Sequence, residues 1–81
     1  MIYQHPDYPR ITIDPDICFG KPCVRGMRMP VSSILDYLST GISIESLIET
    51  FPNLEKEDIL QALAFSSMIM QDTYIPLKKA S

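Results

Sequence analysis

Apolar residues recur at helical spacing in the chain that follows Pro30. In the first segment they fall at positions i, i+3, i+4 and i+7, namely Val31, Ile34, Leu35 and Leu38. The second segment repeats this stripe at Ile44, Leu47, Ile48 and Phe51. Gly41 is placed to end the first helix, and Ser43 is a natural N-cap for the next. Pro52 and Asn53 then stop the second helix.

A third helix is predicted from about Glu55 to Gln71. Its first turn is charged, but from residue 59 to residue 70 no side chain carries a charge. A helix that is apolar nearly all round should be buried nearly all round, and two short helices cannot cover it. We therefore expect a protein–protein surface here and in the tail that follows. The candidate interface residues are Leu60, Ala64, Met68, Met70, Tyr74, Ile75 and Leu77.

The N-terminal part of the chain lacks helical spacing. Residues 1–10 are interpreted as an irregular arm, and residues 11–29 as a small β-ribbon with extended pieces at 11–13 and 22–24 and a possible third at 27–29. Gly20 and Gly26 stand where turns need positive φ. Residues 72–81 form a tail that either frays or orders on a partner. The sequence thus predicts a single, mainly α domain, with a trihelical core over residues 30–71 and a small N-terminal β-ribbon.

The run L-x2-G-x-S-x3-L-I-x2-F-x2-L, over residues 38–54, has the layout of a helix-turn-helix. Leu47, Ile48 and Leu63 are expected to hold the helices crossed, and the third helix takes the recognition position. That helix begins with three carboxylates, which repel phosphate groups, so it is a poor reader of DNA. Any contact with nucleic acid is therefore expected mainly in the β-ribbon.

The charge distribution supports this placement. The net charge is −3, yet four of the seven basic residues lie in the N-terminal third, whereas residues 32–72 hold seven carboxylates and one cation. The candidate DNA contacts are Lys21, Arg25, Arg28, Lys56 and Gln61. A second interpretation stays open, in which these cations are solvated or neutralise the acidic helices.

No pattern of catalytic residues is present, and we expect neither an enzyme nor a cofactor. His5 is the only histidine and is interpreted as a surface residue, while Cys18 and Cys23 are too few for a zinc site and are interpreted as small apolar side chains. No segment approaches the roughly 20 apolar residues that span a bilayer. Without an export signal, two thiols suit the reducing cytoplasm. Because 46% of the residues are apolar, a homodimer or a protein partner is expected to cover part of them.

Residues 11–64, about two thirds of the chain, resemble a bacterial and archaeal family catalogued as domain of unknown function 433. The most distinctive match is G-K-P-x-x-R-G-x-R, from Gly20 to Arg28. The other matching positions are Ile11, Ile13, Asp14, Pro15, Val31, Ile34, Leu35, Leu38, Gly41, Ser43, Pro52, Leu54, Glu57, Asp58, Ile59, Ala62, Leu63 and Ala64. Glu55 stands where the family often has Ser or Thr, so the usual capping box with Asp58 is expected to be lost.

The resemblance implies a helix-turn-helix domain with an N-terminal β element. Members of the family look like antitoxins that bind and inhibit a PIN-like ribonuclease toxin, and such antitoxins commonly also bind their own operator DNA. The function expected from the resemblance is therefore an antitoxin-like module in a toxin–antitoxin system. The alternative is a protein-interaction or dimerisation domain that does not bind nucleic acid.

Overall fold

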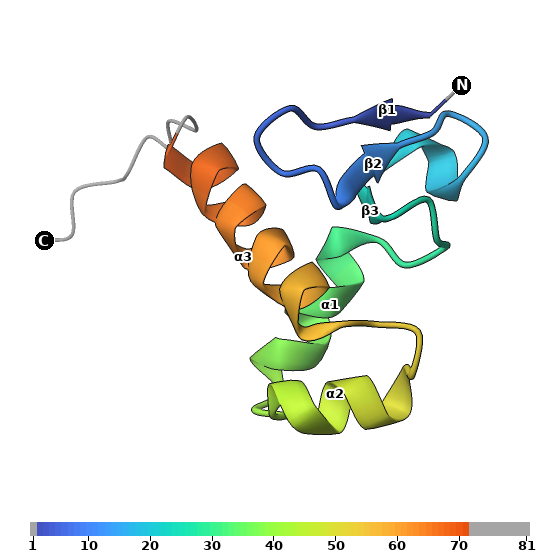
Figure 1. The fold of residues 1–81 in the computed structure, drawn as a ribbon. Helices are drawn as coiled ribbons and strands as arrows, with labels where there is room; N and C mark the ends of the chain where they lie inside the picture. Colours follow the sequence, from blue (N-terminus) through green and yellow to red (C-terminus); the bar gives the residue numbers. More distant parts are fainter. Residues whose placement is uncertain (1, 72–81) are drawn as a thin grey trace, which may run out of the picture.

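The computed structural model describes residues 2–71 of the chain as a small sheet followed by three helices. The elements in order are β1 (Tyr3–Gln4), β2 (Ile11–Ile13), the 3-10 turn η1 (Cys18–Gly20), β3 (Cys23–Val24), α1 (Val31–Ser39), α2 (Ile44–Thr50) and α3 (Lys56–Gln71). The sheet lies at one end of the molecule and α2 at the other, with α1 between them, while α3 runs from beside α1 up along one side of the sheet (Figure 1). This arrangement confirms the predicted trihelical core with a small N-terminal ribbon.

The sheet is antiparallel, in the order β1-β2-β3, with Tyr3 opposite Ile13 and Ile11 opposite Val24. Two expectations about it were wrong. Part of the N-terminal arm forms β1, and a strand of two residues is too short to give a periodic signal. The piece at 27–29 is not a strand, because Pro30 has no N–H to donate, and the pairing there stops at one bridge between Cys23 and Pro30.

The ends of the helices follow the sequence signals closely. The Ser43 hydroxyl accepts a hydrogen bond from the backbone N–H of Ser46 at 3.0 Å, which confirms the predicted N-cap of α2. Gly41 has a φ of 90° and donates its N–H to the carbonyl of Leu38, which confirms its role after α1.

The start of α3 corrects the expectation that the capping box is lost. The Asp58 carboxylate accepts a hydrogen bond from the backbone N–H of Glu55 at 2.8 Å. This half of a capping box needs only the acidic side chain three residues into the helix, whichever residue stands at the cap. Half of the capping box is therefore kept.

One apolar core joins the ribbon to the helices. Its buried members are Ile11, Val24, Val31, Ile34, Leu47, Leu54, Ile59, Ala62 and Phe65. Leu47 and Ile48 contribute to the core as expected, but Leu63 does not, because it is 39% exposed. The buried side of α3 passes through residues 58, 59, 62 and 65, so helical geometry turns Leu63 toward solvent.

His5 fixes the N-terminal arm to the helices and is only partly exposed, contrary to the expectation of a surface residue. Its Nδ1 atom accepts hydrogen bonds from the backbone N–H groups of Asp7 and Tyr8, at 3.1 and 3.2 Å. Its ring meets Phe65 edge to face, with 5.5 Å between the ring centroids. Within residues 2–71 no helix is long and apolar enough to cross a membrane.

Candidate functional site

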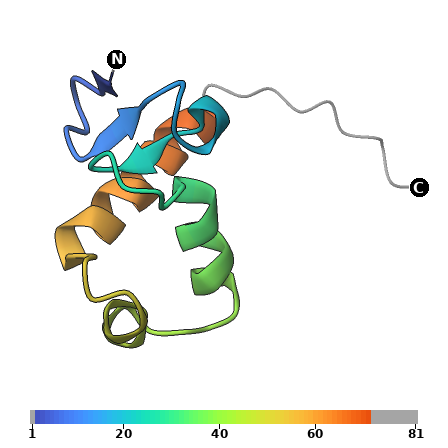
Figure 2. The ribbon, with the colours of Figure 1, turned by 90° about the vertical axis from the view of Figure 1, so that its right-hand side faces the viewer.

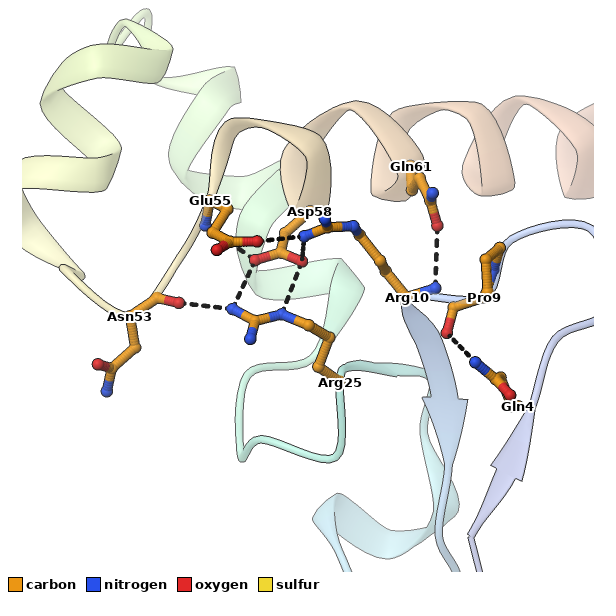
Figure 3. Close-up of polar contacts among 8 residues, drawn as sticks. All are labelled: Gln4, Pro9, Arg10, Arg25, Asn53, Glu55, Asp58 and Gln61. Carbon is orange, nitrogen blue, oxygen red and sulfur yellow. Dashed lines mark hydrogen bonds and ion pairs between the residues drawn. The ribbon is translucent and has the colours of Figure 1, made fainter.

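A cluster of charged side chains lies where the ribbon meets the first turn of α3 (Figure 3). At its centre is Asp58, whose side chain is fully buried. Arg25 holds this carboxylate with two hydrogen bonds, from Nε to Oδ1 at 2.9 Å and from Nη2 to Oδ2 at 2.8 Å. Arg10 donates a further bond to Oδ1 at 2.9 Å and also pairs with Glu55. The cluster therefore connects the start of β2 and the turn after β3 to α3 through one carboxylate.

These contacts keep Asp58 ionised. Burial by itself raises the pKa of a carboxyl group, but the hydrogen bonds from Arg25, the Glu55 backbone and Arg10 outweigh it and hold the pKa of Asp58 below its ordinary value. The hydrogen bond to Asp58 likewise raises the pKa of Arg25, and those to Glu55 and Asp58 raise the pKa of Arg10. The three groups thus stabilise one another in their charged forms.

The backbone at Arg25 directs its side chain to this cluster. Arg25 has a φ of 46° and Gly26 a φ of 71°, and the N–H of Met27 donates to the carbonyl of Val24 at 2.8 Å. Two successive positive φ values define a tight turn of the hairpin type, in which a non-glycine residue costs free energy. The Arg25 guanidinium offsets this cost through Asp58 and through a third bond to the carbonyl of Asn53 at 2.6 Å.

The five candidate DNA contacts do not form one patch. The guanidinium of Arg25 is engaged by Asp58, and the Gln61 side chain accepts the backbone N–H of Arg10 at 2.9 Å. The other three, Lys21, Arg28 and Lys56, are exposed and make no ion pair with any other residue among 2–71. Lys21 lines a groove between α1 and α3, whereas Arg28 lines a hollow beside the turn that precedes α3.

Sequence reasoning missed the central residues of the cluster. Neither Arg10 nor Asp58 was singled out as a site residue, although the position of Asp58 in the first turn of α3 marks it as a capping carboxylate. What no local pattern could show is that two arginines, 48 and 33 residues away in the chain, reach this carboxylate. Those contacts depend on the way the ribbon packs on the helix.

A strip of mostly apolar side chains, interrupted by Ser67, faces solvent along α3. We call it the outer face of α3, and it consists of Leu60, Leu63, Ala64, Ser67 and Met70. The spacing of three and four residues puts all five on one side of the helix. Leu60 is 41% exposed, Leu63 39% and Met70 58%.

The predicted interface residues are only partly those of the outer face. Leu60, Ala64 and Met70 lie on it, and Leu63 joins them although it was expected to hold the helices together. Met68 is half-buried and packs against the core, so its position does not favour an interface role. Tyr74, Ile75 and Leu77 lie outside the described residues.

The two cysteines are neighbouring free thiols. Burial, together with a hydrogen bond and charge interaction with Cys18, raises the pKa of Cys23 to about 11. A thiol of this kind stays protonated at neutral pH and is a poor nucleophile. Within residues 2–71, no three of the His, Cys, Asp and Glu side chains gather in a way that could hold a metal ion.

Comparisons with known proteins place this chain among proteins of similar sequence and fold. Residues 11–66 match a family model described as "Protein of unknown function (DUF433)". The uncharacterised protein y4eO of Sinorhizobium fredii is 38% identical over 56 residues, which are 69% of this chain and 25% of that protein. The crystal structure of a DUF433 member protein from Anabaena variabilis superposes with a TM-score of 0.71 at 27% identity, covering 78% of this chain and 62% of that one. The chain thus spans a quarter of the length of the curated relative and less than two thirds of the solved one.

Proposed function

Since this chain belongs to the DUF433 family, whose function is unknown, we propose that it is an antitoxin-like module that binds and inhibits a PIN-like ribonuclease through the outer face of α3. The observation that carries the proposal is the exposure of this face, because the ribbon, α1 and α2 all pack on the opposite side of α3. Apolar side chains of this size gain free energy when a partner removes them from water. The antitoxin assignment itself comes from the family resemblance.

The charge of the chain suits a ribonuclease as the partner. An enzyme that binds RNA needs cations for the phosphate groups, so its substrate-binding surface is basic. This chain has a net charge of −3, and the exposed Glu57 stands in the first turn of α3, beside the exposed Lys56 that precedes Leu60 by one turn. The outer face supplies contact area, and the net negative charge of the chain attracts a basic partner, a combination that favours both affinity and fast association.

Substitution of Leu63 by Glu tests this proposal. The partner to be used is the product of the adjacent gene, which the proposal requires to be a PIN-like ribonuclease. Because a carboxylate in the centre of an apolar contact must lose its water, Leu63→Glu should raise the dissociation constant of the complex by about tenfold or more. Binding is measured by calorimetry, and inhibition by cleavage of a labelled RNA.

A matched control is available in the sheet. Ile13 is 37% exposed, close to the 39% of Leu63, but it lies on β2 rather than on α3. Ile13→Glu should leave binding and inhibition within about twofold, since surface changes outside an interface have small effects. The proposal would be contradicted if both variants lost binding and inhibition equally, or if Leu63→Glu bound and inhibited the ribonuclease like the wild type.

Binding of operator DNA is the second part of the proposed antitoxin role. It rests on the exposed cations Lys21, Arg28 and Lys56, which remain available for phosphate contacts. The internal use of Arg25 and Gln61 reduces the candidate contacts from five to three. That observation favours the alternative function, a protein-interaction domain without nucleic-acid binding.

A further inference from the structure

The turn η1 holds the most exposed large apolar side chain among residues 2–71. Phe19 is 98% exposed, and the chain around it runs through Cys18, Phe19 and Gly20 with φ values of 51°, 57° and 77°. Three successive left-handed residues are rare, and the conformation is unfavourable for both Cys18 and Phe19. The structure therefore accepts backbone strain in a segment that presents an aromatic ring to water, which is typical of a binding element.

The turn is firmly held despite this strain. The N–H of Gly20 donates to the carbonyl of Ile17 at 3.1 Å, and the N–H of Lys21 donates to the carbonyl of Cys18 at the same distance. The preceding turn is closed by a bond from the N–H of Ile17 to the carbonyl of Asp14 at 2.9 Å. A side chain on so ordered a turn loses little conformational entropy when it binds.

An apolar groove opens close to this turn. It has a volume of about 350 Å³ and lies between the start of α1 and the second half of α3. Its lining includes Lys21, Pro22, Val31, Leu35, Phe65 and Met70. Lys21 directly follows η1, and η1, α1 and the end of α3 lie on the same side of the molecule (Figure 2).

We propose that two copies of this chain form a twofold dimer in which Phe19 of each copy fills the groove of the other. In a twofold contact the same two features must meet twice, so a protruding group and its receiving groove have to lie close together on one face. Here Phe19 and the groove residue Lys21 are two positions apart in the chain. The groove is large enough for an aromatic ring, and its apolar lining suits one.

The charges beside the ring also favour a second copy. Lys21 is exposed at the rim of the groove, and Asp16 is exposed in the turn before Phe19. The proposed contact pairs Asp16 of one copy with Lys21 of the other, and the twofold axis repeats the pair. Opposite charges at the rim of an apolar contact favour this orientation over others.

Substitution of Phe19 by Asn separates a binding role from a structural one. Asn tolerates the left-handed region better than Phe, so the melting temperature of the monomer should stay the same or rise. The dissociation constant of the dimer should rise by about tenfold or more, because the substitution removes the central buried side chain of the contact. Sedimentation equilibrium of the whole chain over a range of concentrations measures the association, and calorimetry at low concentration measures melting.

Reversal of the rim charges gives an independent test. Lys21→Asp alone or Asp16→Lys alone should weaken the dimer, and the double variant should restore much of the affinity, since each reciprocal pair is rebuilt with opposite polarity. The outer face of α3 supplies the control, because Leu63→Glu should leave this dimer unchanged.

Three results would overturn the dimer. They are a wild-type chain that stays monomeric at every concentration, a dimer that Phe19→Asn leaves intact, and a dimer that Leu63→Glu disrupts instead. The ribonuclease is absent from these measurements, so a result that overturns the dimer would not contradict the proposed function of the outer face. Likewise, a failure of Leu63→Glu to weaken ribonuclease binding would not contradict the dimer.

Discussion

Asp58 shows how one side chain determines the relation between the ribbon and the helices. Two arginines from the ribbon and a backbone N–H of the helix start all donate to its carboxylate, which is excluded from water. A buried charge of this kind is stable only while its partners are present, and removal of one side leaves the other uncompensated. The arginines therefore belong first to the fold. Arg25, which the sequence marked as a DNA contact, is the clearest example.

The pH dependence of stability tests this account of Asp58. Since the pKa of Asp58 is lower in the folded chain than in the unfolded one, its contribution is fully present above about pH 4 and is lost as the pH falls through the folded pKa. Asp58→Asn should lower the free energy of unfolding by about 2–3 kcal/mol at pH 7. The difference in free energy of unfolding between the wild type and Asp58→Asn should be smaller at pH 3. Urea unfolding at both pH values measures this difference. A difference that is the same at pH 7 and pH 3 would contradict a lowered pKa of Asp58 in the folded chain.

The helices were predictable from sequence because their signals are local. Apolar spacing, Gly41 and Ser43 define α1 and α2, and the predicted third helix agrees with α3. The strands β1 and β3 hold only two residues each, too few for a period, and their pairing depends on long-range contacts. The sequence also indicated that α3 carries more apolar surface than the other two helices can cover. Which side stays uncovered follows only from the structure, in which residues 58, 59, 62 and 65 are buried.

The ribbon, rather than α3, is the element in which DNA binding should be tested. Arg25→Ala would disturb the cluster at Asp58, so it cannot report on DNA alone. Arg28→Ala removes an exposed cation that forms no ion pair within the described part of the chain, and Arg28 lies outside the proposed dimer contact, to which Lys21 belongs. If the operator is bound, the affinity should fall steeply with salt, and Arg28→Ala should reduce the slope of log affinity against log salt concentration by about 1 per chain. Binding that is absent, or insensitive to salt, would favour the interaction domain without nucleic-acid contact.

On the scale of the whole molecule, residues 2–71 present two apolar surfaces to which we assign partners. The outer face of α3 is proposed for a ribonuclease, and the groove with Phe19 for a second copy of the chain. Met70 lies at the border of both, but Leu63 and Phe19 each belong to one surface alone. Because Leu60, Leu63 and Ala64 do not line the groove, the proposed dimer leaves these residues of both outer faces open, and two ribonuclease molecules are expected per dimer.

Methyl NMR shows directly whether the outer face of α3 binds the ribonuclease. The chain is labelled at leucine and methionine and titrated with the adjacent gene's ribonuclease. We expect chemical-shift changes at Leu60 and Leu63, while the buried Leu47 and Leu54 stay unchanged. Changes at Met27 and Met29 of the ribbon, with Leu60 and Leu63 unaffected, would contradict it.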